Sequence, residues 1–177
     1  MGSLLVVTGP PGAGKSTLAG FLSDHLIHSV LVEGDRFFGF LRTGAVDSWL
    51  PDAHAQNTVV TEAAGSAVGR YVDGGYETVY DGIIGPWFLS TFAAATGLDH
   101  LDYVVLLPSV ERCVQHVDRR TGHSFADEAA TRHMHDQFAR AAIASRHLLV
   151  DPPADVEATG QAVLGLRAAL TLRYTIA

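Results

Sequence analysis

The only lysine of the chain stands in a glycine-rich stretch near the N-terminus, Gly9-Pro10-Pro11-Gly12-Ala13-Gly14-Lys15-Ser16-Thr17. The stretch matches the spacing G-x-x-x-x-G-K-[ST] at every specified position. Glycines in this pattern let backbone N–H groups turn inward around an anion, and a following helix adds the partial positive charge of its N-terminus. The chemistry expected of this segment is the binding of a phosphate chain.

The 12 lysine and arginine residues of the chain comprise Lys15 and eleven arginines. Lys15 therefore marks a position that needs a compact ammonium rather than a planar guanidinium. We expect Lys15 to reach the β- and γ-phosphates of a nucleotide, and the Ser16 hydroxyl to ligate Mg²⁺. The alternative is a glycine-rich turn between a strand and a helix, with an incidental lysine.

The elements that would position this stretch alternate between strands and helices. Apolar runs predict strands at 4–8, 29–33, 77–80, 103–107 and 147–150. Helices are expected at about 15–26, 55–72, 86–95, 109–119 and 127–145 and after Asp155, with 36–54 irregular and rich in aromatic residues. This alternation predicts an α/β fold with a parallel sheet covered by helices on both faces.

Two carboxylates follow predicted strands. Asp35 comes after the second strand and Asp81 after the third. Ligands of a parallel sheet bind at the carboxyl ends of its strands, so both should lie near the glycine-rich stretch. We expect Asp35 to be the general base that takes the proton of an attacking hydroxyl, and Asp81 to act on Mg²⁺ through a water or on the acceptor. The alternative is that both belong to simple glycine turns.

Composition narrows the range of functions. A length of 177 residues suits a single domain spanning 1–177, and a net charge of −7 leaves no basic face for nucleic acid. No apolar run approaches the ~20 residues of a membrane span, and the N-terminus does not resemble a signal peptide. The lone cysteine, Cys113, fits a reducing cytoplasm. We expect a cytoplasmic monomer or homodimer that acts on a small molecule, without nucleic acid or membrane as a partner.

The glycine-rich stretch and its context resemble the P-loop NTPase superfamily along the whole chain. The N-K-x-D motif of GTPases is absent from the sequence, and the layout is similar to the small-molecule kinases, such as gluconate kinase, shikimate kinase, adenylylsulfate kinase, chloramphenicol phosphotransferase and adenylate kinase. The resemblance implies a three-layer P-loop kinase-like fold with a five-stranded parallel sheet of order 2-3-1-4-5. It also implies ATP and Mg²⁺ as cofactors. The residues implied to bind the nucleotide are Gly9, Gly12, Ala13, Gly14, Lys15, Ser16, Thr17 and Arg112.

The resemblance also implies a lid at about 112–126. Arg119 and Arg120 lie just after the helix that follows the fourth strand, where gluconate kinase-like and adenylate kinase-like proteins carry an arginine-bearing lid. Such arginines would neutralise charge on the migrating phosphoryl group and exclude water. The alternative is a basic helix end that complements the helix dipole.

The acceptor-binding segment is expected at about 36–54. Phe38 and Trp87 belong to a group of aromatic residues after the second and third strands. With Asp35, Arg36 and Asp81, they are the expected acceptor contacts, and they would suit an apolar or ring-bearing face; the alternative is plain core packing. The arginines that could bind an anionic group of the acceptor, or lie solvated at the surface, are Arg36, Arg42 and Arg70.

The sequence thus favours a phosphotransferase that moves the γ-phosphoryl group of ATP to a hydroxyl of a sugar acid, an antibiotic or a nucleoside-like compound. A stand-alone antibiotic-resistance enzyme would fit this description. The alternative is a P-loop NTPase or nucleotide-dependent regulatory or binding module with no small-molecule acceptor.

Overall fold

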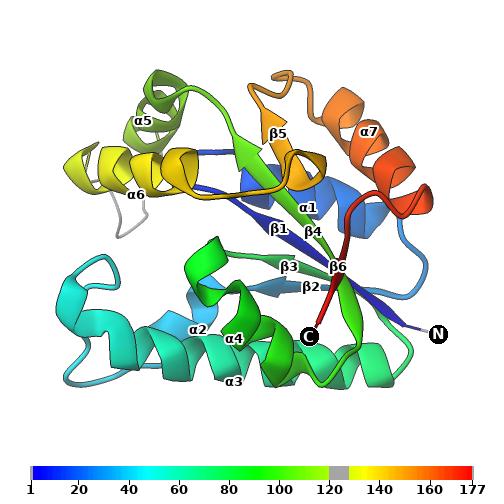
Figure 1. The fold of residues 1–177 in the computed structure, drawn as a ribbon, viewed down its shortest axis with the longest axis horizontal. Coiled ribbons are helices and arrows are strands. Elements are labelled where there is room, and N and C mark those ends of the chain that lie inside the picture. The colour runs from blue at the N-terminus through cyan, green and yellow to red at the C-terminus, as the bar shows by residue number, and fades with distance from the viewer. Residues whose placement is uncertain (1, 120–127, 177) are drawn as a thin grey trace.

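The computed structural model describes residues 2–119 and 128–176 of the chain. In these residues a six-stranded sheet lies between two layers of helices (Figure 1). Five strands pair in parallel in the order β2-β3-β1-β4-β5, which confirms the predicted order. The strands are β1 (Ser3–Thr8), β2 (Ser29–Glu33), β3 (Glu77–Asp81), β4 (His100–Leu107), β5 (Leu148–Val150) and β6 (Arg173–Thr175).

Seven α-helices are assigned within the described residues. They are α1 (Lys15–Asp24), α2 (Asp35–Gly39), α3 (His54–Asp73), α4 (Pro86–Thr96), α5 (Val110–Asp118), α6 (Glu128–Arg140) and α7 (Val156–Ala168). None of the described helices is long and apolar enough to cross a membrane.

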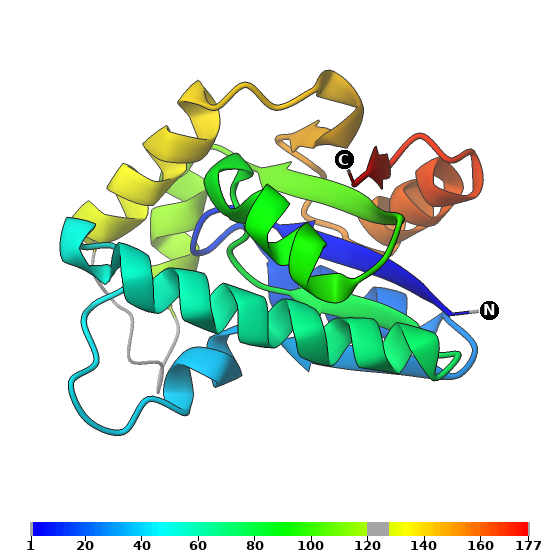
Figure 2. The same cartoon turned by 60° about the horizontal axis from the view of Figure 1, so that its bottom comes forward.

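The two helix layers follow from the alternation of side chains along β1. Leu4 and Val6 pack into a core shared with α3, α4 and Phe138 of α6. Leu5 and Val7 point to the other face, where they join a core formed with α1, α7 and Cys113 of α5. Successive strand residues face opposite sides of a sheet, and both cores consist mainly of apolar side chains, as expected for a parallel sheet buried on two faces. Figure 2 brings α3 and α4 forward over their face.

The structure corrects several expected boundaries. The segment 36–54 is not wholly irregular, because it contains most of α2 and a short 3₁₀ turn, Pro51–Ala53. Helix α6 ends at Arg140 rather than near 145. Strand β6 was not expected, since three residues carry no periodic signal, and it forms by antiparallel pairing with His100–Asp102 of β4. The start expected for α6 at 127 lies outside the described residues.

Candidate active site

The stretch Gly9–Thr17, here called the P-loop, joins β1 to α1. Gly12 and Gly14 have positive φ angles of 76° and 93°, a conformation that glycine adopts at little cost. A Cβ atom at Gly12 would also overlap the backbone carbonyl of Cys113. The P-loop therefore packs closely on α5, and this contact requires glycine at position 12.

The carboxyl ends of β1, β3 and β2 lie side by side. In the strand register Val7 is level with Asp81, and Asp81 with Glu33. Lys15 Nζ donates a hydrogen bond to Pro10 O at 3.1 Å, and its charge acts on Asp81. This arrangement gathers the predicted lysine and strand-end carboxylate at one edge of the sheet.

Asp81 is the last residue of β3 and is 8% exposed. Burial raises the pKa of Asp81, while the Lys15 ammonium and a hydrogen bond from the Ser16 hydroxyl act in the opposite direction. The structure thus brings together the two residues expected at a metal ion. A hydroxyl and a carboxylate are the oxygen ligands that Mg²⁺ accepts, so the pair fits this ion.

No group of three or more His, Cys, Asp or Glu side chains suited to a metal ion occurs within residues 2–119 and 128–176. Mg²⁺ in phosphoryl-transfer sites is usually held by one or two protein oxygens together with phosphates and waters. A Ser16–Asp81 pair is sufficient for that mode of binding.

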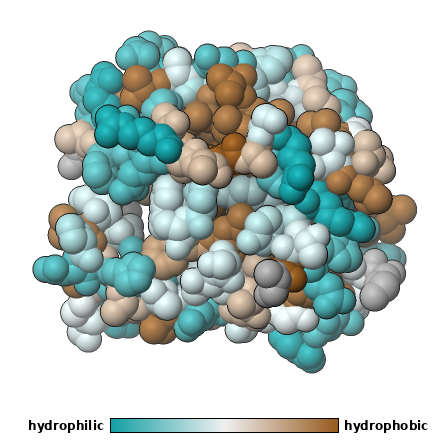
Figure 3. All heavy atoms as spheres, viewed as in Figure 1, coloured by the Kyte–Doolittle hydropathy of each residue, from teal (hydrophilic) through white to brown (hydrophobic). Residues whose placement is uncertain are grey.

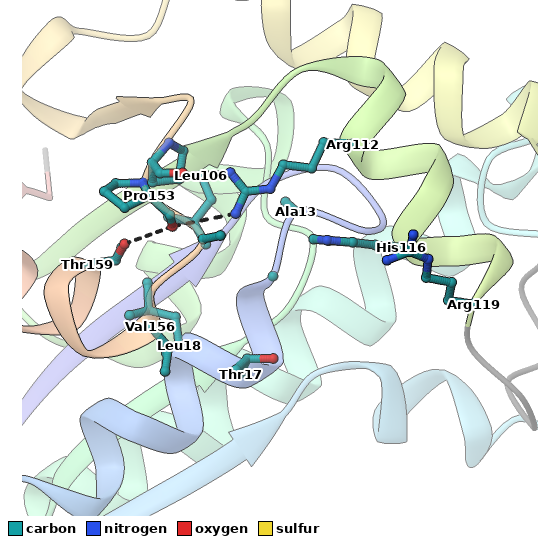
Figure 4. Close-up of a pocket in the computed structure, with 13 residues that line it drawn as sticks. Ala13, Thr17, Leu18, Leu106, Arg112, His116, Arg119, Pro153, Val156 and Thr159 are labelled. Atoms are coloured by element: carbon teal, nitrogen blue, oxygen red, sulfur yellow. Dashed lines mark hydrogen bonds between the residues drawn. The ribbon is translucent and has the colours of Figure 1, made fainter.

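One side of the P-loop opens into a pocket of about 310 Å³, here called the nucleotide pocket. Ala13, Gly14 and Thr17 line it, and Arg112 of α5 and Arg119, directly after α5, also reach it (Figure 4). Arg112 donates hydrogen bonds to Pro152 O at 2.6 Å and to Pro153 O at 3.5 Å. The remaining wall combines apolar and polar side chains: Leu18, Leu106, His116, Pro152, Pro153, Ala154, Val156 and Thr159.

The other side of the P-loop opens into a larger cavity of about 740 Å³, here called the acceptor cavity. Its walls come from α2, the segment 41–51, α3, α4 and α6, with Lys15 at the P-loop end. Figure 3 shows a hollow between the layer of α6 and the layer of α2 and α3, on the left of the view. Three of the expected acceptor contacts, Asp35, Phe38 and Trp87, line this cavity.

Two of the expected acceptor contacts lie elsewhere. Arg36 is exposed and pairs with Glu33 at 2.7 Å, outside the cavity wall. Asp81 is not part of that wall either. Arg120 and the lid positions 120–126 lie outside the described residues.

Sequence reasoning missed several residues of both pockets. His116 lies between α5 and the P-loop, with Nδ1 at 2.9 Å from Gly12 O. Asp47 lines the acceptor cavity, and Gln56 and Asn57 bind the backbone beside it. No sequence motif marks these positions. The only available signal was the polar start of α3, which follows an aromatic-rich segment in the sequence.

Comparisons with known proteins agree with this architecture at the level of the fold. No family model matches the chain, and no curated protein matches its sequence. Among solved structures, the APS kinase of Mycobacterium tuberculosis, in complex with AMPPNP and APS, is similar at 17% identity and a TM-score of 0.71, over 94% of this chain and 98% of that one.

Two further solved structures are similar over nearly their whole length. The tunicamycin resistance protein of Deinococcus radiodurans matches 100% of this chain and 99% of its own, at 13% identity and a TM-score of 0.68. A gluconokinase from Sinorhizobium meliloti matches 96% of this chain and 93% of its own, at 17% identity and a TM-score of 0.63. The chain therefore has the fold of the P-loop kinases, which confirms the fold that the sequence predicted.

Proposed function

We propose that this protein is an ATP- and Mg²⁺-dependent phosphotransferase that moves the γ-phosphoryl group to a hydroxyl of a small molecule. One observation carries the proposal: the P-loop separates two pockets. Ala13, Gly14 and Thr17 line the nucleotide pocket, whereas Lys15 lines the acceptor cavity together with Asp35. A phosphate chain bound along the P-loop would run from the first pocket to the second, and would end beside Lys15.

The acceptor cavity supplies the groups that a hydroxyl needs in order to react. Asp35 holds the acceptor hydroxyl and takes its proton as the oxygen forms a bond to the γ-phosphorus. The bond from the γ-phosphorus to the bridging oxygen breaks, and ADP leaves. Lys15 balances the negative charge of the phosphates. Arg119, which follows α5 and lies in the wall of the nucleotide pocket, adds further positive charge.

Ser16 would ligate Mg²⁺ directly, and Asp81 would act on the ion through a water. When bound there, the ion would supply positive charge to the phosphate oxygens. The charge that Arg120 and a lid at 112–126 would add is part of the proposal and rests on the sequence resemblance.

The size and enclosure of the acceptor cavity favour transfer over the alternative of an NTPase or regulatory module. Small-molecule sites usually occupy about 300–1,000 Å³, and the volume of about 740 Å³ lies within that range. A switch protein that only hydrolyses a nucleotide has no need of such a cavity beside the phosphates. We propose a cytoplasmic enzyme, monomeric or homodimeric, with no nucleic-acid partner.

The test is ADP release by the purified chain with ATP and Mg²⁺, across a panel of hydroxyl-bearing metabolites and antibiotics. We expect release to require one added compound and to be lost in Lys15→Ala. ADP release that depends on an added macromolecule, with no small molecule needed, would support the alternative instead.

A further inference from the structure

We propose that the acceptor is a neutral or cationic hydroxyl compound with a flat apolar face, and that compounds carrying a carboxylate, sulfate or phosphate are poor acceptors. This inference rests on the proposed function, because it concerns the acceptor side of the same cavity. It removes sugar acids from the range of acceptors that the sequence left open.

The first argument is the charge of the cavity wall. Asp35 and Asp47, both exposed, line the acceptor cavity. Its described lining residues include one lysine or arginine, Lys15, and two histidines, His54 and His133. Lys15 lies at the P-loop end, where the phosphates would bind. An anionic group on the acceptor would therefore lie near two carboxylates and a triphosphate. Like charges at short range repel, and salt weakens this repulsion where the charges are exposed.

The second argument is the position of the arginines that the sequence suggested for an anionic acceptor. Arg36 pairs with Glu33 at 2.7 Å and Arg70 pairs with Asp73 at 3.4 Å. Neither of them lines the cavity, and Arg42 does not either. Recognition of carboxylate, sulfate or phosphate usually relies on the paired donors of arginine, and the described wall has no arginine.

The third argument is a set of aromatic side chains in the cavity wall, which come from the two carboxylate-bearing segments and from α4. Phe38 comes from α2, Trp49 from the segment before α3, and Trp87 and Phe88 from α4. The Trp87 ring packs edge-on against the Phe138 ring, with 5.1 Å between the ring centroids. The Phe88 ring stacks on the His54 ring, with 5.5 Å between the centroids. These contacts fix both rings, yet Trp87 is still 42% exposed. A ring or other flat apolar group of the acceptor would cover this surface.

The fourth argument is that the wall around Asp47 is held in place. The side-chain amide of Gln56 accepts a hydrogen bond from Val46 N at 2.8 Å and donates one to Val46 O at 2.7 Å. Asn57 Nδ2 donates to Ser48 O at 2.7 Å. Two side chains at the start of α3 therefore hold the backbone on both sides of Asp47, and this keeps Asp47 at the cavity wall.

Both tryptophans of the chain line this cavity, which provides a direct binding assay. The probes are phenylethanolamine, styrene glycol and mandelate. They share a phenyl ring and a hydroxyl-bearing carbon and end in an ammonium, a hydroxyl and a carboxylate group, respectively. We expect the first two to change tryptophan emission, and mandelate to bind at least about tenfold more weakly than phenylethanolamine. Equal or tighter binding of mandelate, or no change in emission with any probe, would overturn the proposal.

A charge variant tests whether the cavity wall causes this preference. In Asp47→Asn the ratio of mandelate to phenylethanolamine dissociation constants should fall by about threefold or more, because one repelling charge is removed. The matched control is Asp52→Asn, which removes the same charge five residues away and outside the cavity wall. The control should keep the wild-type ratio. If this ratio changed equally in both variants, or changed in neither, Asp47 would not be the cause of the preference.

These measurements need no turnover, so the two proposals can fail separately. If the expected probes bind but no hydroxyl compound is phosphorylated, the proposed activity is wrong and the proposed ligand class still stands. Transfer to an anionic acceptor as the fastest substrate would keep the activity and overturn the ligand class.

Discussion

The imidazole of His116 joins α5 to the P-loop, with Nδ1 at 2.9 Å from the carbonyl oxygen of Gly12 across 104 residues of sequence. A carbonyl oxygen only accepts hydrogen bonds, so Nδ1 carries the proton of this contact. The backbone of Cys113, one turn earlier in α5, lies against the same glycine. Side-chain and backbone contacts from α5 thus both act on the turn that would surround the phosphates.

Replacing His116 should weaken nucleotide binding more than it slows transfer. A hydrogen bond of this kind contributes about 1 kcal/mol, so we expect His116→Ala to raise the KM for ATP about fivefold, with a smaller change in kcat. The measurement is ADP release as a function of ATP concentration. The control is His100→Ala, at an exposed position at the start of β4. A KM unchanged from wild type would show that the contact does not shape the P-loop.

Asp81 should give the activity a characteristic dependence on pH and Mg²⁺. Burial raises the pKa of Asp81, so this carboxyl binds a proton at higher pH than an ordinary aspartate. In the proposed role, only the ionised carboxylate would help to hold Mg²⁺. The Mg²⁺ concentration for half-maximal rate should therefore rise as the pH is lowered toward that pKa. Asp81→Asn should raise the Mg²⁺ concentration for half-maximal rate by about tenfold or more at neutral pH. In this variant the same concentration should depend less on pH than in wild type. A wild-type requirement that does not vary with pH would contradict this role.

Asp35 should affect the chemical step and leave the metal requirement unchanged. Asp35→Asn keeps the side-chain volume but loses the proton acceptor, so we expect kcat to fall by about 10²-fold, near the lower end for a general base. The KM for ATP should change little. Glu33→Gln is the matched control, since Glu33 pairs with Arg36 outside the cavity wall. Normal turnover of Asp35→Asn at saturating acceptor would exclude Asp35 as the base.

The fold and the meeting of the P-loop with Asp81 could be predicted from sequence because their signals are local. The P-loop spacing and the apolar strands each occupy a few consecutive residues, and Lys15, Ser16 and Asp81 then meet through the strand order. The acceptor half depends on contacts between distant segments. Asp47 enters the cavity wall beside backbone that Gln56 and Asn57 hold, and no periodicity could show this.

An ion-pair network at the opposite end of the sheet should control stability without affecting activity. Arg167 of α7, 14% exposed at its side chain, pairs with Glu77 at 2.5 Å and with Asp102 at 3.1 Å, and donates to Ser3 Oγ. Arg167→Ala would leave the largely buried Asp102 and the partly buried Glu77 without their cation. We expect it to lower the free energy of unfolding by about 3 kcal/mol, measured by urea denaturation.

The control for this network is Arg140→Ala. Arg140 pairs with Asp136 one turn away, but the Arg140 side chain is 80% exposed, and such pairs contribute at most about 0.5 kcal/mol. A similar loss of stability in both variants would contradict the importance of the buried network.

The same network predicts a loss of stability in acid. Burial alone would raise the pKa of Glu77, but hydrogen bonds from Ser3 and Arg167 outweigh it, and the pKa lies below its usual value. This carboxylate therefore contributes stability above the pKa it has in the unfolded chain, and the contribution is lost as the pH falls through the lowered folded pKa. Glu77→Gln should be less stable than wild type at neutral pH, and the difference should shrink in acid. A difference that stays constant with pH would show that the charge of Glu77 is not responsible.

The claim that the P-loop delivers a phosphoryl group to a hydroxyl beside Asp35 is tested most directly by phosphorus NMR. The full chain is incubated with ATP and Mg²⁺, with and without the panel compound that most stimulates ADP release. We expect ADP and a new phosphate monoester to appear together, only with the compound present, and neither to appear with Lys15→Ala, whose circular dichroism should match wild type. Release of ADP and inorganic phosphate at the same rate with or without the compound would contradict the account.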